Sequence, residues 1–219
     1  MCCPWNKRFL LVLFLPALAA ASPSEEELFF KGVADVNDGD LRFLPDPPAR
    51  PVHHHQNRIR VDEASLSTGW VRLEQCHRHL DPVPNLQIVY NPERIRNIAI
   101  LGSAQVDKAW VQENTVQIEG VRALAQICIG AETRALVDDG DGRYSLRNGP
   151  YMRRFLDGYY PMRVSLEVEL AAPRLRYHSI EPAAQPGFQV RHAQREVAYD
   201  AWFEGRLNTL IRFERHPDQ

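Results

Sequence analysis

Two short groups of histidines are the residues of this sequence best suited to chemistry. Five of the eight histidines fall in the runs 53–55 and 77–79. In a β-strand, residues i and i+2 lie on the same face, so the first and third residues of each run point the same way. Neutral imidazoles bind borderline divalent ions, and each pair is suited to sharing one copper or zinc ion. The predicted metal ligands are His53, His55, His77 and His79.

These two groups meet if the strands that carry them are paired. A run of alternating apolar and polar residues follows the first group, and another precedes the second, as is typical of strands with one dry face. Pairing the runs with their apolar residues on one face sets His55 opposite His77 and His53 opposite His79. All four imidazoles then form one patch. The alternative is a polar rim of histidines at a sheet edge.

Cys76 and Cys128 are the cysteines that follow the N-terminal segment, and both lie in strand-like runs. A bridge between them closes a loop of roughly 50 residues and contributes about 4 kcal/mol in the loop-entropy model. We predict this disulfide; the alternatives are two reduced buried thiols, a thiolate metal ligand or a nucleophile. Cys76 has the opposite parity from the apolar residues before it. A bulge near Gln75 would turn it inward and would also move the second histidine group off the common face.

The N-terminus has the pattern of a secretory signal peptide. Lys7 and Arg8 precede a short apolar core and a run of small residues, and cleavage is expected near Ala21. This core is too short to span a bilayer as a helix, and we expect no integral membrane span after cleavage. The sequence therefore predicts an exported protein, either periplasmic or secreted, in which a disulfide is stable.

The charge balance argues against a nucleic-acid partner. The chain has 26 Lys and Arg residues against 28 Asp and Glu residues, a formal net charge of −2. A general nucleic-acid binder needs an excess of positive charge to meet the phosphates. Removal of the basic signal segment makes the balance more negative still.

Short apolar runs separated by turn residues recur from residue 58 onward, which indicates an all-β fold of one or two β-sandwich domains with a short junction helix. A bridge across the two sheets resembles the arrangement of immunoglobulin domains, but no tyrosine stands two residues before Cys128 and no tryptophan lies at the expected depth between the cysteines. The expected segments are a signal peptide (1–21), an extended N-terminal arm (22–56), a β-sandwich domain (57–147), and a short helix with a second β region (148–219).

Residues 148–158 are the helical candidate. Asn148 or Gly149 can cap the helix, Pro150 suits its first turn, and Gly158 can end it. The apolar residues at helical spacing predict packing at the junction between the two β regions. An alternative is an aromatic binding platform formed by Tyr151, Phe155, Tyr159 and Tyr160.

No catalytic motif is present: the sequence has no nucleophile elbow, zinc-protease motif, phosphate loop or dinucleotide fingerprint. Catalytic residues therefore stay unknown, and the sequence implies no cofactor beyond copper or zinc. We expect a non-catalytic binding or cell-envelope assembly module whose partner is an unknown protein or envelope component. The alternative is a copper- or zinc-binding protein or metalloenzyme built on the histidines. A third option, a carbohydrate hydrolase, needs a facing pair of carboxylates.

Overall fold

The computed structural model describes residues 39–216, most of which lie in β-strands. The predicted all-β fold is confirmed. The predicted signal peptide and the first part of the predicted arm lie outside the described residues. Within 39–216, no helix has the length and apolar character needed to cross a membrane.

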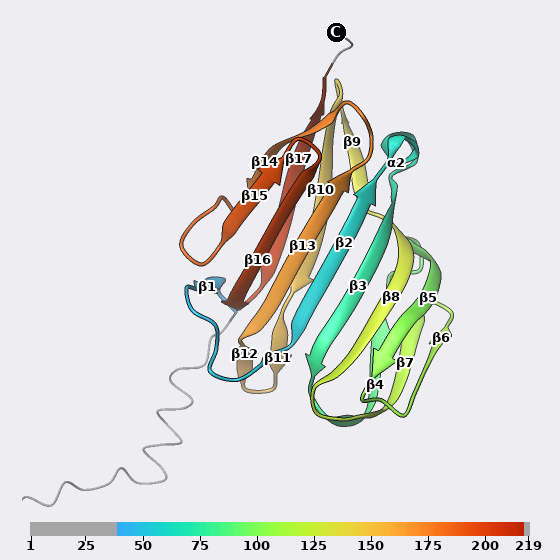
Figure 1. Ribbon diagram of the computed structural model, residues 1–219, viewed down its shortest axis with the longest axis vertical. Helices are drawn as coiled ribbons and strands as arrows, with labels where there is room; N and C mark the ends of the chain where they lie inside the picture. The colour runs from blue at the N-terminus through green and yellow to red at the C-terminus, as the bar shows by residue number, and fades with distance from the viewer. Residues whose placement is uncertain (1–38, 217–219) are drawn as a thin grey trace, which may run out of the picture. The chain divides into compact units, whose positions relative to one another are not determined.

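The largest element is an eight-stranded sheet, which we call the large sheet (Figure 1). In spatial order its strands are β1 (Arg42–Leu44), β16 (Glu196–Glu204), β13 (Met162–Leu170), β2 (His54–Val61), β3 (Trp70–Leu80), β8 (Ala125–Arg134) and β5 (Ile95–Ala104), with β15 (Gln189–Ala193) also paired to β16. The β2–β13 pairing is parallel. It joins a strand of the predicted first β region to a strand of the second, so the two regions share one sheet.

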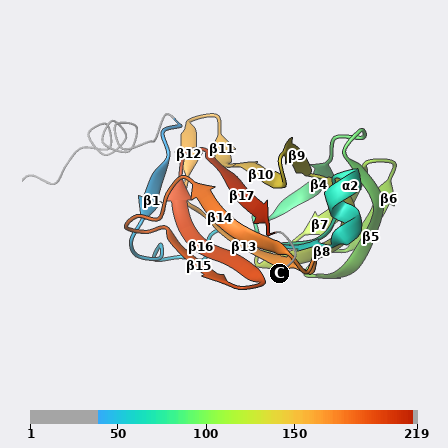
Figure 2. The ribbon, with the colours of Figure 1, turned by 90° about the horizontal axis from the view of Figure 1, so that it is seen from above.

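Two smaller sheets cover this sheet. A four-stranded sheet has the order β14 (Leu175–Glu181), β17 (Leu207–Arg215), β10 (Arg143–Tyr151) and β9 (Leu136–Gly140). A three-stranded sheet has the order β4 (Val83–Val89), β7 (Thr115–Val121) and β6 (Lys108–Gln112). Figure 2 shows β10, β9 and β4 on the same side of the large sheet. A separate hairpin consists of β11 (Arg153–Phe155) and β12 (Gly158–Tyr160).

Each covering sheet encloses its own hydrophobic cluster against the large sheet. The first cluster joins residues such as Val164 and Leu166 of β13 to Ile211 of β17. The second joins Ile127 of β8 to Ile118 of β7. Facing partners in a sheet point the same way, and the register runs across β2, β3 and β8 without changing face. Both clusters therefore lie on one face of the large sheet, which we call its inner face.

Strand alternation follows the sequence closely. In β13, the residues at even positions from Met162 to Leu170 are buried and the odd ones are half-buried. The polar side chains on the outer face form ion pairs with neighbouring strands, as between Arg163 and Asp200 and between Arg58 and Glu167. This alternation is expected of a strand that has one face in the hydrophobic core and the other toward solvent.

The helix α2 (Glu63–Thr68) connects β2 to β3 and was not predicted. Asp62 caps it through a capping box with Ser65, and Gly69 ends it in the left-handed conformation with φ 75°. A single helical turn between antiparallel strands keeps the predicted strand pairing, because it only replaces the expected loop.

The predicted junction helix at 148–158 is wrong. Strand β10 extends into this segment, where Tyr151 pairs with Leu207, and the rest forms the β11–β12 hairpin. Residues at helical spacing do not share a buried face, since Phe155 is 46% exposed and Leu156 is fully exposed. Pairing with β17 supplies backbone hydrogen bonds along the strand, whereas a two-turn helix is marginal without tertiary packing.

The predicted disulfide between Cys76 and Cys128 is confirmed, but its position differs from the expectation. The two cysteines are direct partners on the adjacent strands β3 and β8, with 4.0 Å between their Cα atoms. The bridge therefore links neighbours within one sheet and does not cross between sheets. No bulge occurs at Gln75, so Cys76 keeps its outward parity and the bridge lies on the outer face.

Candidate functional site

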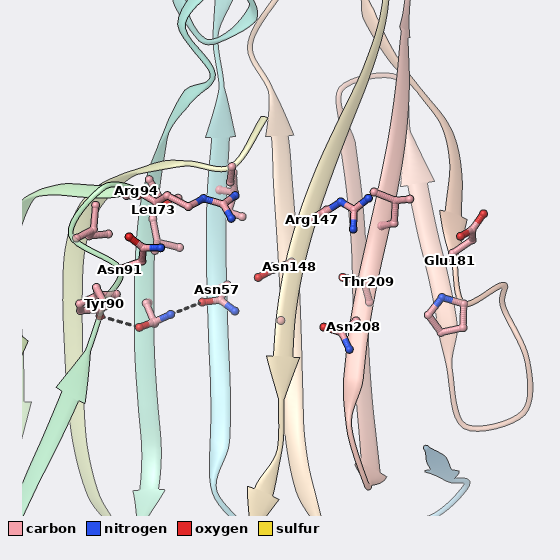
Figure 3. Close-up of a pocket in the computed structure, with 18 residues that line it drawn as sticks. Asn57, Leu73, Tyr90, Asn91, Arg94, Arg147, Asn148, Glu181, Asn208 and Thr209 are labelled. Atoms are coloured by element: carbon pink, nitrogen blue, oxygen red, sulfur yellow. Dashed lines mark hydrogen bonds between the residues drawn. The ribbon is translucent and has the colours of Figure 1, made fainter. Parts of the chain in front are cut away.

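A cleft of about 700 Å³ opens on the inner face of the large sheet, between the two covering sheets. Ile59 and Leu73 of β2 and β3 lie on its floor. One wall is the segment that follows β4, and the other is the edge of β10, which β9 covers only as far as Leu146. Figure 3 shows the side chains that line it. Its polar lining comprises Asn57, Gln75, Tyr90, Asn91, Arg94, Thr133, Arg147, Asn148, Glu181, Asn208 and Thr209.

A chain of hydrogen bonds crosses the cleft from one wall to the other. The Tyr90 hydroxyl donates to Oε1 of Gln75 at 2.7 Å, and Nε2 of Gln75 donates to Oδ1 of Asn57 at 3.2 Å (Figure 3). Nδ2 of Asn57 donates to the Tyr151 hydroxyl at 2.6 Å, and that hydroxyl donates to Oδ1 of Asn148. Burial raises the pKa of both tyrosines, so each hydroxyl keeps its proton.

The histidine cluster, defined as His53, His55 and His77, adjoins this chain. The predicted register is confirmed, because His55 is the direct partner of His77. The ring centroids of these two lie 4.3 Å apart, and those of His53 and His77 lie 5.3 Å apart. Tyr151 contacts His55 edge-on at 4.8 Å. Three of the four predicted ligands thus come together, at the end of the hydrogen-bonded chain.

The hydrogen bonds of His77 determine which of its nitrogens carries the proton. Oε1 of Gln75 is an acceptor 3.2 Å from Nε2 of His77, so Nε2 donates. Nδ1 of the neutral ring then accepts from Nε2 of His53 at 3.1 Å. Burial lowers the pKa of His77 to about 3 and that of His53 to about 4, and holds the pKa of His55 well below its ordinary value. All three rings are therefore neutral near pH 7.

His79 does not join the cluster, so its predicted pairing with His53 is wrong. The pairing of β3 with β8 shifts between Arg78 and Leu80, which makes His79 the bulged residue, with φ 54°. Its Nδ1 lies 3.3 Å from the backbone oxygen of Val52. A bulge does interrupt β3, but it lies at His79, after His77, and not at Gln75, before His77.

His54 points to the outer face, as its even parity in the strand requires. Its Nε2 lies 2.7 Å from Oγ of Ser165 on β13. Burial, aided by the nearby positive charge of Arg163, lowers the pKa of His54 to about 4. This imidazole is separated from the histidine cluster by the sheet itself.

The four residues of the predicted aromatic platform are divided between two places. Tyr151 and Tyr159 are each only 5% exposed. Tyr159 lies on the β11–β12 hairpin together with Phe155 and Tyr160, whose rings meet edge-to-face at 5.4 Å. Arg153 stacks on Phe155 at 5.0 Å and binds Asp81 through two nitrogens. The four rings form no common platform, and Tyr151 instead belongs to the cleft's hydrogen-bonded chain.

Part of this site has a signal in the sequence besides the histidines. Asn57 and Gln75 occupy positions whose parity places them on the dry face, between apolar or histidine neighbours. Buried amides on a dry face need partners, so their presence there indicates a polar network. The sequence around Tyr90 and Asn148 gives no such indication, because the positions of these residues in the cleft depend on how the covering sheets are placed.

In the described part of the chain, no group of three or more His, Cys, Asp or Glu side chains is arranged to hold a metal ion. Comparison of the chain with family models, with characterised proteins and with solved structures finds no match. The function must therefore be argued from the cleft itself.

Proposed function

We propose that this protein is an exported, non-catalytic binding protein, and that a hydroxyl-rich envelope component such as a saccharide occupies the cleft between the covering sheets. The observation that carries this proposal is the cleft's lining. Side-chain amides both donate and accept hydrogen bonds, as sugar hydroxyls do. A volume of about 700 Å³ falls within the usual range for small-molecule sites.

The hydrogen-bonded chain supports the same function. Asn57 is held by two partners and Gln75 by three, one of them His77, so the orientations of both amides are set before a ligand arrives. A preorganised site loses less entropy when it binds. Apolar side chains on the floor, such as Ile59 and Leu73, offer contact to the C–H faces of a sugar ring.

The lining favours binding over hydrolysis. Glycoside hydrolysis usually requires two carboxylates that flank the scissile bond. Among the described residues that line the cleft, Glu181 is the sole carboxylate, and it pairs with Arg212 at 2.7 Å. The arrangement supports a protein that holds its ligand unchanged.

Two observations support export. The N-terminal sequence has the order of a signal peptide. The Cys76–Cys128 bridge suits an oxidising compartment such as the periplasm. An envelope saccharide and this protein would then share one compartment.

A screen of the mature protein against a panel of mono- and oligosaccharides by thermal shift tests the proposal, with calorimetry for each hit. A ligand at 100 times its Kd stabilises the folded state by about 2.7 kcal/mol, so a hit should raise Tm by several degrees. Thr133→Trp, which fills the cleft from its floor, should abolish the shift. Gln126→Trp, on the outer face of the same strand, is the matched control and should keep it. An equal shift in Thr133→Trp would contradict the proposal.

Copper or zinc binding is the second candidate function, and one observation favours it. His53, His55 and His77 come together, and Nε2 of His55 is buried without a hydrogen-bond partner among the described residues. Calorimetry with Cu(II) and Zn(II) at pH 7.5 tests it, using protein without a histidine tag. Saturable one-to-one binding tighter than about 1 μM, lost in His55→Ala, would support it. Without such binding, the saccharide proposal stands alone.

A further inference from the structure

The hydrogen-bonded chain in the cleft has a direction. Each member donates toward the β10 wall: Tyr90 to Gln75, Gln75 to Asn57, Asn57 to Tyr151, and Tyr151 to Asn148. The hydroxyl of Tyr151 has one proton, and because it accepts from Asn57 it gives that proton to Oδ1 of Asn148. This orients the Asn148 amide, with Oδ1 turned toward the chain.

The chain ends on a donor that has no acceptor. Nδ2 of Asn148 is buried and has no hydrogen-bond partner among the described residues, while the residue itself lines the cleft (Figure 3). An unpaired buried donor is costly, and most such groups in native proteins are paired. A ligand that supplies an oxygen acceptor at this position would complete the chain.

The charge of the lining points to the kind of acceptor. Arg94 donates from Nε and an Nη to the backbone oxygen of Arg134, at 3.1 and 3.0 Å. Neither Arg94 nor Arg147 is ion-paired with a carboxylate among residues 39–216. Glu181, at the far end of the cleft, is already neutralised by Arg212. Arg147 follows the alternation of β10 and leaves the strand on the face opposite Asn148, on the same side as Ser145, so it stands only at the rim of the cleft. The cleft therefore presents the uncompensated guanidinium group of Arg94, which favours a planar oxyanion.

We infer that the ligand of the cleft is an acidic saccharide, a hydroxylated ring that carries a carboxylate. The carboxylate accepts from Nδ2 of Asn148 and is balanced by the charge of Arg94. The ring hydroxyls exchange hydrogen bonds with the remaining amides. This inference rests on the proposed function and adds the chemical class of the ligand.

Calorimetry with matched pairs of sugars tests the inference: glucose against glucuronate, and galactose against galacturonate. Each pair differs at one carbon, so the comparison isolates the carboxylate. We expect the uronate to bind at least about tenfold more tightly than its neutral partner. The preference should weaken as salt is raised, because part of it is electrostatic.

Asn148→Asp keeps the side chain's shape but replaces the free donor with a negatively charged acceptor. It should weaken uronate binding by roughly 100-fold and change neutral-sugar binding by no more than about threefold. Asn85→Asp, at an exposed position on β4, adds the same charge away from the cleft and should leave both affinities unchanged. Arg94→Gln, at an exposed residue of the cleft lining, should cost roughly tenfold for the uronate alone and serves where Asn148→Asp does not fold.

The outcomes separate the two claims. Equal affinity for a uronate and its neutral partner, or tighter binding of the corresponding sugar phosphate, overturns the inference and leaves the cleft as a binding site. Unchanged uronate affinity in both Asn148→Asp and Arg94→Gln overturns it as well. If no member of either pair, and no sugar of the wider panel, binds the protein, the proposed function fails and the inference fails with it.

Discussion

The two faces of strands β2 and β3 carry polar side chains of different kinds, although they belong to the same backbone. On the outer face, Arg58 contacts Glu74 and Glu167, and the side chains of the Arg58–Glu74 pair are 58% and 60% exposed. On the inner face, Asn57 and Gln75 carry no charge and are held by specific partners.

The two faces therefore differ in how much each polar group matters to stability. Exposed ion pairs contribute at most about 1 kcal/mol each, because water screens them and long side chains must be ordered. A buried amide that loses its partner costs about 1–3 kcal/mol. The outer face therefore tolerates substitution, while the inner face specifies one arrangement of donors and acceptors. Substitutions and pH changes that act on one face at a time test this contrast.

A large effect should come from the disulfide on the outer face. Replacement of both Cys76 and Cys128 by serine removes a bridge that closes a 52-residue separation. In the loop-entropy model this lowers the free energy of unfolding by about 4 kcal/mol. Urea denaturation of the two forms measures it. The mature protein, unfolded without reductant, should show no free thiol, and labelling of both Cys76 and Cys128 would contradict the bridge.

Lowering the pH should reduce the stability of the fold through the histidine cluster on the inner face. The folded-state pKa values of His53 and His77 are lowered from 6.5 to about 4 and about 3, so the unfolded chain binds more protons at acid pH. Their contribution to stability is full above pH 6.5 and is lost as pH falls toward 4 and below. A pKa lowered by one on folding corresponds to about 1.4 kcal/mol, so the total loss should reach several kcal/mol.

Urea denaturation at pH 7.5, 5.5 and 4 measures this slope. His77→Gln keeps an amide donor near Gln75 and should flatten the slope. His178→Gln, at an exposed histidine beside Glu214, is the control and should leave it nearly unchanged. The same slope in wild type and His77→Gln would show that the acid sensitivity arises elsewhere.

Breaking the hydrogen-bonded chain at its centre should cost less than the acid transition. Tyr151→Phe leaves Nδ2 of Asn57 and Oδ1 of Asn148 without their partner. We expect a loss of about 2 kcal/mol in the free energy of unfolding. Tyr160→Phe removes a hydroxyl from the exposed hairpin, where it binds Asp157, and should change stability by less than about 0.5 kcal/mol. Equal losses in both variants would refute the contrast between the faces.

The smallest effect should come from the outer-face ion pairs. Arg58→Ala removes contacts to Glu74 and Glu167, and the expected loss is within about 0.5 kcal/mol. Because the pairs are exposed, added salt should shrink even this difference. A loss above about 2 kcal/mol, measured by urea denaturation, would mean that the outer face is as specific as the inner one.

Local periodicity was enough to predict most of the strands and one register. The parity of the apolar residues fixed His55 opposite His77, because a slip by one residue would have exposed the whole dry face. Parity was also right for Cys76, which points outward as the pattern requires; the expected inward turn was wrong. The bridge needs only that Cys76 and Cys128 be partners on adjacent strands, on either face.

Other features depend on contacts that no local pattern encodes. The bulge at His79 shows in the shifted pairing of β3 with β8, and a strand's own sequence does not reveal its partner's register. Residues 148–158 match a helical spacing, but pairing of Tyr151 with Leu207 decides their structure. The cleft requires Tyr90 and Asn148 to lie on opposite walls, one beside each covering sheet, and this placement depends on the order of all the strands.

The two walls of the cleft stand on one continuous floor, the hydrogen-bonded strands β2 and β3. Many binding proteins close on a ligand by rotating two lobes about a hinge, but walls fixed to the same sheet have no such axis. Capture and release of the proposed ligand should therefore be single kinetic steps, without a slow isomerisation. The residence time would then be set by the strength of the contacts, so a tighter ligand would differ from a weaker one mainly in how slowly it leaves.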